Sequence, residues 1–198
     1  MNNETKRGIG VALNEATLLG AEVSRERRQA AVTFAVLSLP DDGAEPPEDS
    51  RVSLSLSRVG RVVASLRRSR WDDDSASAVP FSLGDLLATV QSFGGSPVYG
   101  WEFIDIEKGF AGWSGRLSLD ERLGEGGDTH SLTIFQEGVD RHLDVRIWFD
   151  HLRVLRPDHT EIPVEDFIAG GKRWWDGLYS GDPRTRGAGI IPRSPPAE

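Results

Sequence analysis

Glu102 and Asp105 are the residues of this sequence whose types and spacing come closest to a catalytic pair. Two carboxylates beside aromatic rings are what glycoside hydrolysis needs, one to donate a proton and one to attack or to activate water. Tyr99 and Trp113 supply the rings, and the four residues together predict an acidic, aromatic-lined pocket of a hydrolase-like enzyme. One observation opposes this interpretation: residues three apart on a strand point to opposite faces, so the two carboxylates would not act together.

Other catalytic and cofactor-binding patterns are missing from the sequence. The chain has no cysteine, which excludes disulfides, thiolate metal ligands and cysteine nucleophiles. Its four histidines lack the short spacings that would place two of them on one face of an element, so no metal site is expected. The glycine-rich stretch 124–127 lies between polar residues instead of between a strand and a helix, unlike a phosphate-binding loop. We therefore expect neither a metal nor a cofactor.

Tryptophan and arginine provide a second candidate site. The chain has six tryptophans, more than one small core buries easily. Trp148 shares the polar side of its predicted strand with Arg146, and Trp174 would lie about 100° from Trp175 on a helix, nearer the surface and beside Arg173. Exposed Trp and Arg side chains anchor protein interfaces, so the leading hypothesis is a non-enzymatic binding or protein-interaction surface. The alternative is that the helix covers that face of the sheet and buries Trp148.

Charge and hydropathy narrow the class of partner. The formal net charge of −8 repels phosphate backbones, so nucleic acid is not an expected partner. No apolar stretch is long enough for a signal peptide or a membrane span, which favours a cytoplasmic protein. Only three lysines accompany the many arginines, a bias typical of GC-rich bacterial genomes. We expect the partner to be another protein or a second copy of the chain, and the sequence does not exclude binding of a small-molecule ligand.

Composition divides the chain into one domain with two flanking segments. Residues 1–13 are polar and predict a flexible N-terminal segment, and 14–180 form a single domain. Within it, 40–50 is rich in Pro, Asp, Glu and Gly and predicts a flexible acidic loop. The Pro, Arg and Gly content of 181–198 predicts a C-terminal tail.

Hydrophobic periodicity predicts an α+β fold, with antiparallel hairpins forming a curved sheet or partly open barrel and two helices packed against it. Alternation predicts hairpins at 16–39, 51–66 and 131–155, an apolar central strand at 97–106, and helices near 82–93 and 163–179. The alternation changes phase after Asp150, which predicts a bulge or a sharp bend. Gly170 and Gly171 lie inside the second helix and predict a kink or close packing there.

Overall fold

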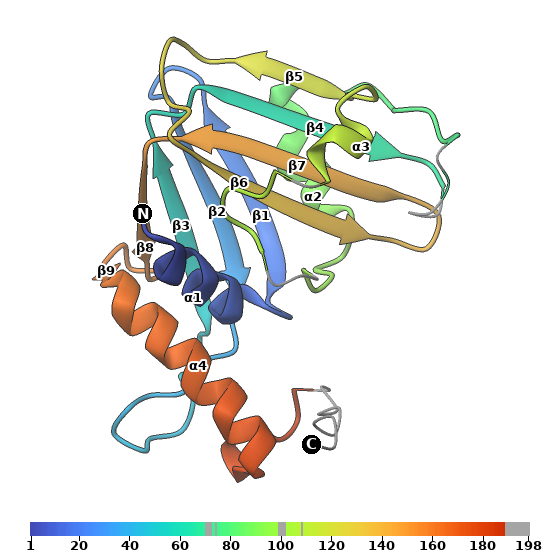
Figure 1. Ribbon diagram of the computed structural model, residues 1–198. Helices are drawn as coiled ribbons and strands as arrows, with labels where there is room; N and C mark the ends of the chain where they lie inside the picture. The colour runs from blue at the N-terminus through green and yellow to red at the C-terminus, as the bar shows by residue number, and fades with distance from the viewer. Residues whose placement is uncertain (70–72, 74, 99–101, 108, 189–198) are drawn as a thin grey trace.

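Two antiparallel sheets stacked on each other form the centre of the protein (Figure 1). The computed structural model describes residues 1–69, 73, 75–98, 102–107 and 109–188. Sheet A has the order β1 (Thr17–Ser24), β2 (Gln29–Ala35), β3 (Arg51–Ser57), β8 (His151–Leu155), β9 (Glu161–Ile162). Sheet B has the order β5 (Leu119–Arg122), β4 (Arg61–Arg67), β7 (His142–Phe149), β6 (His130–Glu137). The predicted α+β class is confirmed, and the described strands form two open sheets without closing into a barrel.

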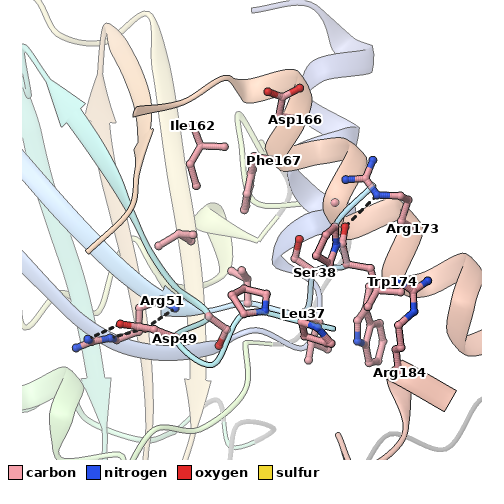
Figure 2. A pocket seen from close by; sticks show the side chains of 18 of the residues that line it. Leu37, Ser38, Asp49, Arg51, Ile162, Asp166, Phe167, Arg173, Trp174 and Arg184 are labelled. Atoms are coloured by element: carbon pink, nitrogen blue, oxygen red, sulfur yellow. Dashed lines mark hydrogen bonds and ion pairs between the residues drawn. The ribbon is translucent and has the colours of Figure 1, made fainter. Parts of the chain in front are cut away.

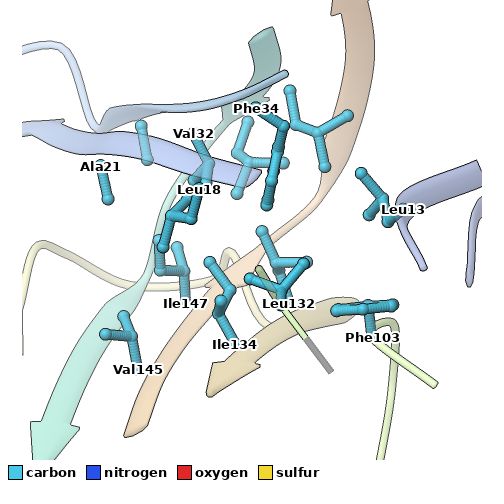
Figure 3. Packing of buried hydrophobic residues seen from close by; sticks show 14 of the residues in the cluster. Leu13, Leu18, Ala21, Val32, Phe34, Phe103, Leu132, Ile134, Val145 and Ile147 are labelled. Atoms are coloured by element: carbon cyan, nitrogen blue, oxygen red, sulfur yellow. The ribbon is translucent and has the colours of Figure 1, made fainter. Parts of the chain in front are cut away.

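The core lies between the two sheets, where their apolar faces meet (Figure 3). In β3 the residues Val52, Leu54 and Leu56 are buried and the serines between them are half-buried, the period of two expected of a strand with one covered face. Val145 and Ile147 of β7 bring the matching apolar side of sheet B. Burial of these side chains is the main force that holds the two sheets together.

The chain crosses between the sheets at two places. The predicted pairing of the two strands in 51–66 is wrong, because β3 pairs with β2 and β8 whereas β4 pairs with β5 and β7. Both hydrogen-bonding edges of β3 are therefore occupied, and the turn around Gly60 carries the chain from sheet A to sheet B. The phase change after Asp150 marks the return, since β7 belongs to sheet B and β8 to sheet A.

The predicted central strand at 97–106 is also wrong for the residues of this segment that the structure describes, 97–98 and 102–106; residues 99–101 lie outside them. The described part of this segment is irregular and makes only isolated bridges, from Pro97 to Thr17 and from Ile104 to Leu132. Its Val98 and Phe103 side chains are buried in the core, so its high apolar content reflects packing across the sheet edges and not a place inside a sheet.

The helix predicted near 82–93 is confirmed as a 3₁₀ turn, η1 (Leu83–Asp85), that continues into α2 (Leu86–Gln91). The Asp85 carboxylate accepts hydrogen bonds from the backbone N–H and the hydroxyl of Ser82, which fixes the start of the helix. A short additional helix, α3 (Phe110–Trp113), precedes β5.

The N-terminal residues form a helix, α1 (Asn3–Leu13), where the sequence predicts a flexible segment. The Asn2 side chain caps the helix by accepting from the Thr5 N–H at 2.8 Å. Ile9 and Leu13 are fully buried, so α1 is held by tertiary packing that outweighs its two internal glycines.

The C-terminal helix α4 (Val164–Ser180) packs on α1 and extends away from the sheets (Figure 1). A Cβ atom on Gly171 would lie 2.6 Å from the Ala12 Cα, so glycine permits the two helices to approach this closely. After α4, a 3₁₀ turn η2 (Pro183–Thr185) buries Thr185 against the domain, so the predicted tail starts later than residue 181. None of the described helices is both long and apolar enough to cross a membrane.

Candidate functional site

The structure separates the predicted tryptophan and arginine surface into two parts. Trp148 and Arg146 lie on β7 of sheet B, whereas Arg173 and Trp174 lie on α4. The prediction that Trp174 lies near the surface is wrong, because its side chain is 3% exposed. The extended segment 36–40 crosses α4 there and covers the indole, with the Leu39 N–H donating to the Gly170 carbonyl at 3.1 Å.

The sheet B part is a cluster of rings around one buried arginine. The Arg146 guanidinium lies 5.1 Å from the centre of the Phe110 ring and 5.0 Å from that of Trp148, and Phe110 contacts Trp113 edge to face. Arg146 also donates to the Ile106 carbonyl at 2.6 Å. Burial lowers the pKa of Arg146. Because the arginine joins the segment around Phe110 to the sheet, we interpret this cluster as a structural clamp and not as an open binding surface.

The two candidate catalytic carboxylates have different surroundings. Glu102 is exposed, whereas Asp105 accepts from Lys6 at 2.7 Å, from His130 at 2.9 Å and from the Ser131 N–H at 2.7 Å. Burial alone would raise the pKa of Asp105, but these hydrogen bonds together lower it. A carboxylate held in its ionised form is suited to joining α1 to sheet B and unsuited to donating a proton. Tyr99, the ring predicted beside this pair, lies outside the described residues.

A buried ion pair joins β4 and β7 on the outer face of sheet B. The Arg67 guanidinium donates to the Asp144 carboxylate, and the two side chains are 7% and 12% exposed. Burial raises the pKa of Asp144 to about 6, although the nearby charges of Arg67 and Arg116 lower it. Desolvation therefore outweighs attraction for this carboxylate.

Asp144 should make stability depend on pH between about pH 4 and pH 6. The folded-state pKa of Asp144, about 6, exceeds the ordinary value of 3.8, so protonation of this carboxylate stabilises the folded state. The stabilisation that comes from protonation is full below about pH 4 and is lost as the pH rises through 6. Relative to Asp144→Asn, the wild type should gain about 2–3 kcal/mol in free energy of unfolding when the pH falls from 7 to 4. Urea denaturation at several pH values measures this difference. Asp120→Asn is the control, because Arg61 lowers the pKa of Asp120 and no gain is expected in that range.

The α4 part of the predicted surface borders the larger of two cavities described here, which we name the α4 groove (Figure 2). Its volume is about 680 Å³, within the usual range of ligand sites. Segment 36–52 forms one wall, and α4 with the residues that follow it forms the other. Phe167 and Ile162 contribute to an apolar floor.

One face of α4 runs along the groove. Its lining residues recur at spacings of three and four, as expected for one side of a helix: Asp166, Phe167, Gly170, Arg173 and Trp174. They span eight helical steps, or about 12 Å along the axis. The groove is therefore long enough to hold about four residues of an extended chain.

Arginines give the groove its charge. Among the described residues, five arginines and three aspartates line it, a formal charge of +2 in a chain whose net charge is −8. Arg51 pairs with Asp49 at 2.6 Å on one side, and Figure 2 places Arg173 and Arg184 on the opposite side. Arg184 donates to Asp182 at 2.8 Å, and the Arg173 Nε donates to the Leu39 carbonyl at 2.9 Å. These bonds fix two guanidinium groups at the rim before any ligand arrives.

The sequence by itself points to few of the residues that line the groove. It predicts Arg173 and Trp174 as site residues, but not Arg51, Arg156 or Arg184. Arg51 is the first residue of β3, Arg156 follows β8, and Arg184 lies in the 3₁₀ turn η2. At such positions no periodic pattern shows what a side chain faces. Only the fold brings them to one cavity.

The second cavity, of about 580 Å³, lies beside Trp148. Arg61, Arg122 and the glycine-rich loop 124–127 contribute to its lining. Arg61 is already occupied, since it donates to both carboxylate oxygens of Asp120 at 2.7 Å. We therefore regard the α4 groove as the stronger candidate.

Neither cavity is lined by Glu102, Asp105 or a histidine among the described residues. Those residues also include no group of three or more His, Cys, Asp or Glu side chains that could hold a metal ion. The side chains that line the α4 groove can recognise a ligand by charge, hydrogen bonds and apolar contact. The chain matches no protein-family model, no curated protein and no solved structure.

Proposed function

We propose that this protein is a non-enzymatic binding protein of the bacterial cytoplasm, and that it holds an extended segment of a partner protein in the α4 groove. The observation that carries the proposal is the groove itself, a cavity of about 680 Å³ with an apolar floor and arginines at its rim. Arginine is among the residue types that contribute most to binding at protein interfaces.

The shape of the groove favours a chain segment as the occupant. It follows α4 for about 12 Å, which matches several residues of an extended backbone. Leu37, Ile162 and Phe167 contribute apolar side chains to the lining, and Arg156 and Arg173 contribute hydrogen-bond donors. An apolar centre with a polar rim is the usual organisation of a protein interface.

The enzyme hypothesis has less support. It requires Glu102 or Asp105 to face a cavity, but Asp105 is bound by Lys6 and His130 and neither carboxylate lines the two cavities. The titratable side chains in the described lining of the α4 groove are three aspartates and five arginines.

Filling the groove should weaken binding at least about tenfold without unfolding the protein. Peptides selected from a random 12-residue display library on the wild type should bind Asp166→Trp at least about tenfold more weakly, because Asp166 lines the groove and is exposed. Glu165→Trp is the matched control, since Glu165 is the preceding exposed residue of α4 and is not part of the groove lining. Fluorescence anisotropy measures the affinities, and equal binding to both variants would contradict the proposal.

Self-association is the alternative occupant and has its own readout. If a second copy of the chain fills the groove, sedimentation equilibrium should give a dimer for the wild type and for Glu165→Trp, but a monomer for Asp166→Trp. In that case the groove is still the interface, and its partner is another copy of this protein.

A further inference from the structure

Arginines and an acidic loop both border the α4 groove. We name four arginines of its lining the arginine wall: Arg173 of α4, Arg184 and Arg186 after it, and Arg156, which follows β8. The acidic loop 40–50 carries five carboxylates, those of Asp41, Asp42, Glu45, Glu48 and Asp49, and of these Asp41 and Asp49 line the groove. The loop has no helix or strand and is mostly exposed.

The arginine wall contacts the loop side mainly through backbone carbonyls. Arg184 donates to the Ala44 carbonyl at 3.1 Å, and Arg173 donates to the Leu39 carbonyl at 2.9 Å. Among the described residues, no carboxylate of the loop forms an ion pair with the arginine wall; Asp49 pairs with Arg51. The carboxylates of Glu45 and Asp42 are nevertheless close enough to contribute to the raised pKa of Arg184, after the larger effect of its hydrogen bond with Asp182.

Long-range attraction of this kind is weak and easily replaced. Exposed charges that do not hydrogen-bond directly stabilise each other only slightly in water, whereas a carboxylate in direct contact with a guanidinium makes short, directional bonds. Arg156, Arg173 and Arg186 have no carboxylate partner within ion-pair distance among the described residues. The arginine wall therefore has unused capacity for carboxylates from another chain.

Given that the groove holds a partner segment, as proposed above, we infer that this segment is acidic and that the acidic loop of the same chain competes with it for the arginine wall. The carboxylates of the loop are attracted to the same arginines, and their negative charge repels an acidic segment, so the loop lowers the affinity for every acidic segment. To bind, a partner must place its carboxylates close enough to the guanidinium groups to accept hydrogen bonds from them, because such bonds outweigh the long-range attraction between the loop and the arginine wall.

The probe for this inference is a fluorescein-labelled peptide with blocked ends, Gly-Glu-Leu-Glu-Pro-Glu-Leu-Glu-Gly, with its Gln counterpart as the uncharged control. We expect the acidic peptide to bind the wild type and the Gln peptide to bind at least about tenfold more weakly at low salt. Arg156→Glu/Arg186→Glu should remove binding of the acidic peptide, because both side chains are exposed and line the groove.

Competition is tested by neutralising the loop with Asp41→Asn, Asp42→Asn, Glu45→Gln and Glu48→Gln in one variant. This variant should bind the acidic peptide about tenfold more tightly than the wild type, because each exposed charge changes affinity by roughly a factor of two. The control variant removes the same number of exposed carboxylates elsewhere on the chain: Glu22→Gln, Glu26→Gln, Glu137→Gln and Asp140→Asn. It should tighten binding less than threefold.

The outcomes separate this inference from the proposed function. Equal tightening by the loop variant and the control variant would show that net charge, and not the loop, sets the affinity, and would overturn the competition. Equal binding of the Glu and Gln peptides would overturn the acidic partner. If library-selected peptides respond to Asp166→Trp but the acidic peptide binds neither the wild type nor the loop variant, the groove function stands and this inference fails. If no peptide responds to Asp166→Trp, the groove function itself fails.

Discussion

Replacing Asp144 with alanine should lower the free energy of unfolding by about 3–5 kcal/mol at pH 7. The substitution leaves the Arg67 guanidinium buried without its carboxylate, since the two side chains are only 7% and 12% exposed. Arginine cannot relieve this cost by losing a proton, because its pKa is too high. Urea denaturation of the purified variant measures the change.

Replacing the other partner of the pair, in Arg67→Met, should lower the free energy of unfolding by less than Asp144→Ala does. Asp144 would then be unpaired, but its pKa is already about 6 and it can become neutral by binding a proton. The double variant Arg67→Met/Asp144→Leu should recover most of the lost stability, because it leaves no buried charge. Glu161→Ala is the control: its pair with Arg153 is exposed and 3.8 Å long, and its loss should cost less than about 0.5 kcal/mol. Similar costs for Asp144→Ala and Glu161→Ala would contradict this account.

Gly171→Ala should destabilise the protein by about 3 kcal/mol, although alanine is the better helix former. Its Cβ would lie 2.6 Å from the Ala12 Cα and 2.7 Å from the Ala12 Cβ, so α1 and α4 would have to separate. The nearest obstacle is backbone and cannot rotate away. Chemical denaturation measures the loss, and peptide binding should weaken as well, because α4 forms one wall of the groove.

The matched control for Gly171→Ala is Gly112→Ala in α3. A Cβ at Gly112 would meet no atom within 4 Å, so this variant should be as stable as the wild type or slightly more stable. If both substitutions have the same effect, then helix propensity and not the contact between α1 and α4 decides the stability at Gly171.

The elements with a complete hydrophobic pattern could be predicted from the sequence. The hairpin of β1 and β2, the hairpin of β6 and β7, and the helices α2 and α4 all appear where alternation or helical spacing places them. Their patterns are reliable because each buries one face, and burial of one face imposes a period on the residues. The fold class follows from the same patterns.

The candidate site could be predicted only in small part. Arg173 and Trp174 do border the α4 groove, but Trp174 is buried under the segment 36–40 instead of exposed on the surface. Trp148 and Arg146 belong to a separate ring cluster on sheet B. A local pattern states which side chains share a face, but it does not state what covers that face.

By itself, the sequence determined the hairpin of β1 and β2, the hairpin of β6 and β7, the helices α2 and α4, the absence of cysteine chemistry and the acidic character of the chain. These properties depend on residues close together along the chain. Tertiary structure alone decided that β3 and β4 lie in different sheets, that residues 3–13 form a buried helix, and that arginines from 156 to 186 meet an acidic loop across one groove. These features depend on contacts between residues far apart in the sequence, because each element is stabilised by packing against another. The hydrophobic periodicity of a single segment does not indicate such contacts.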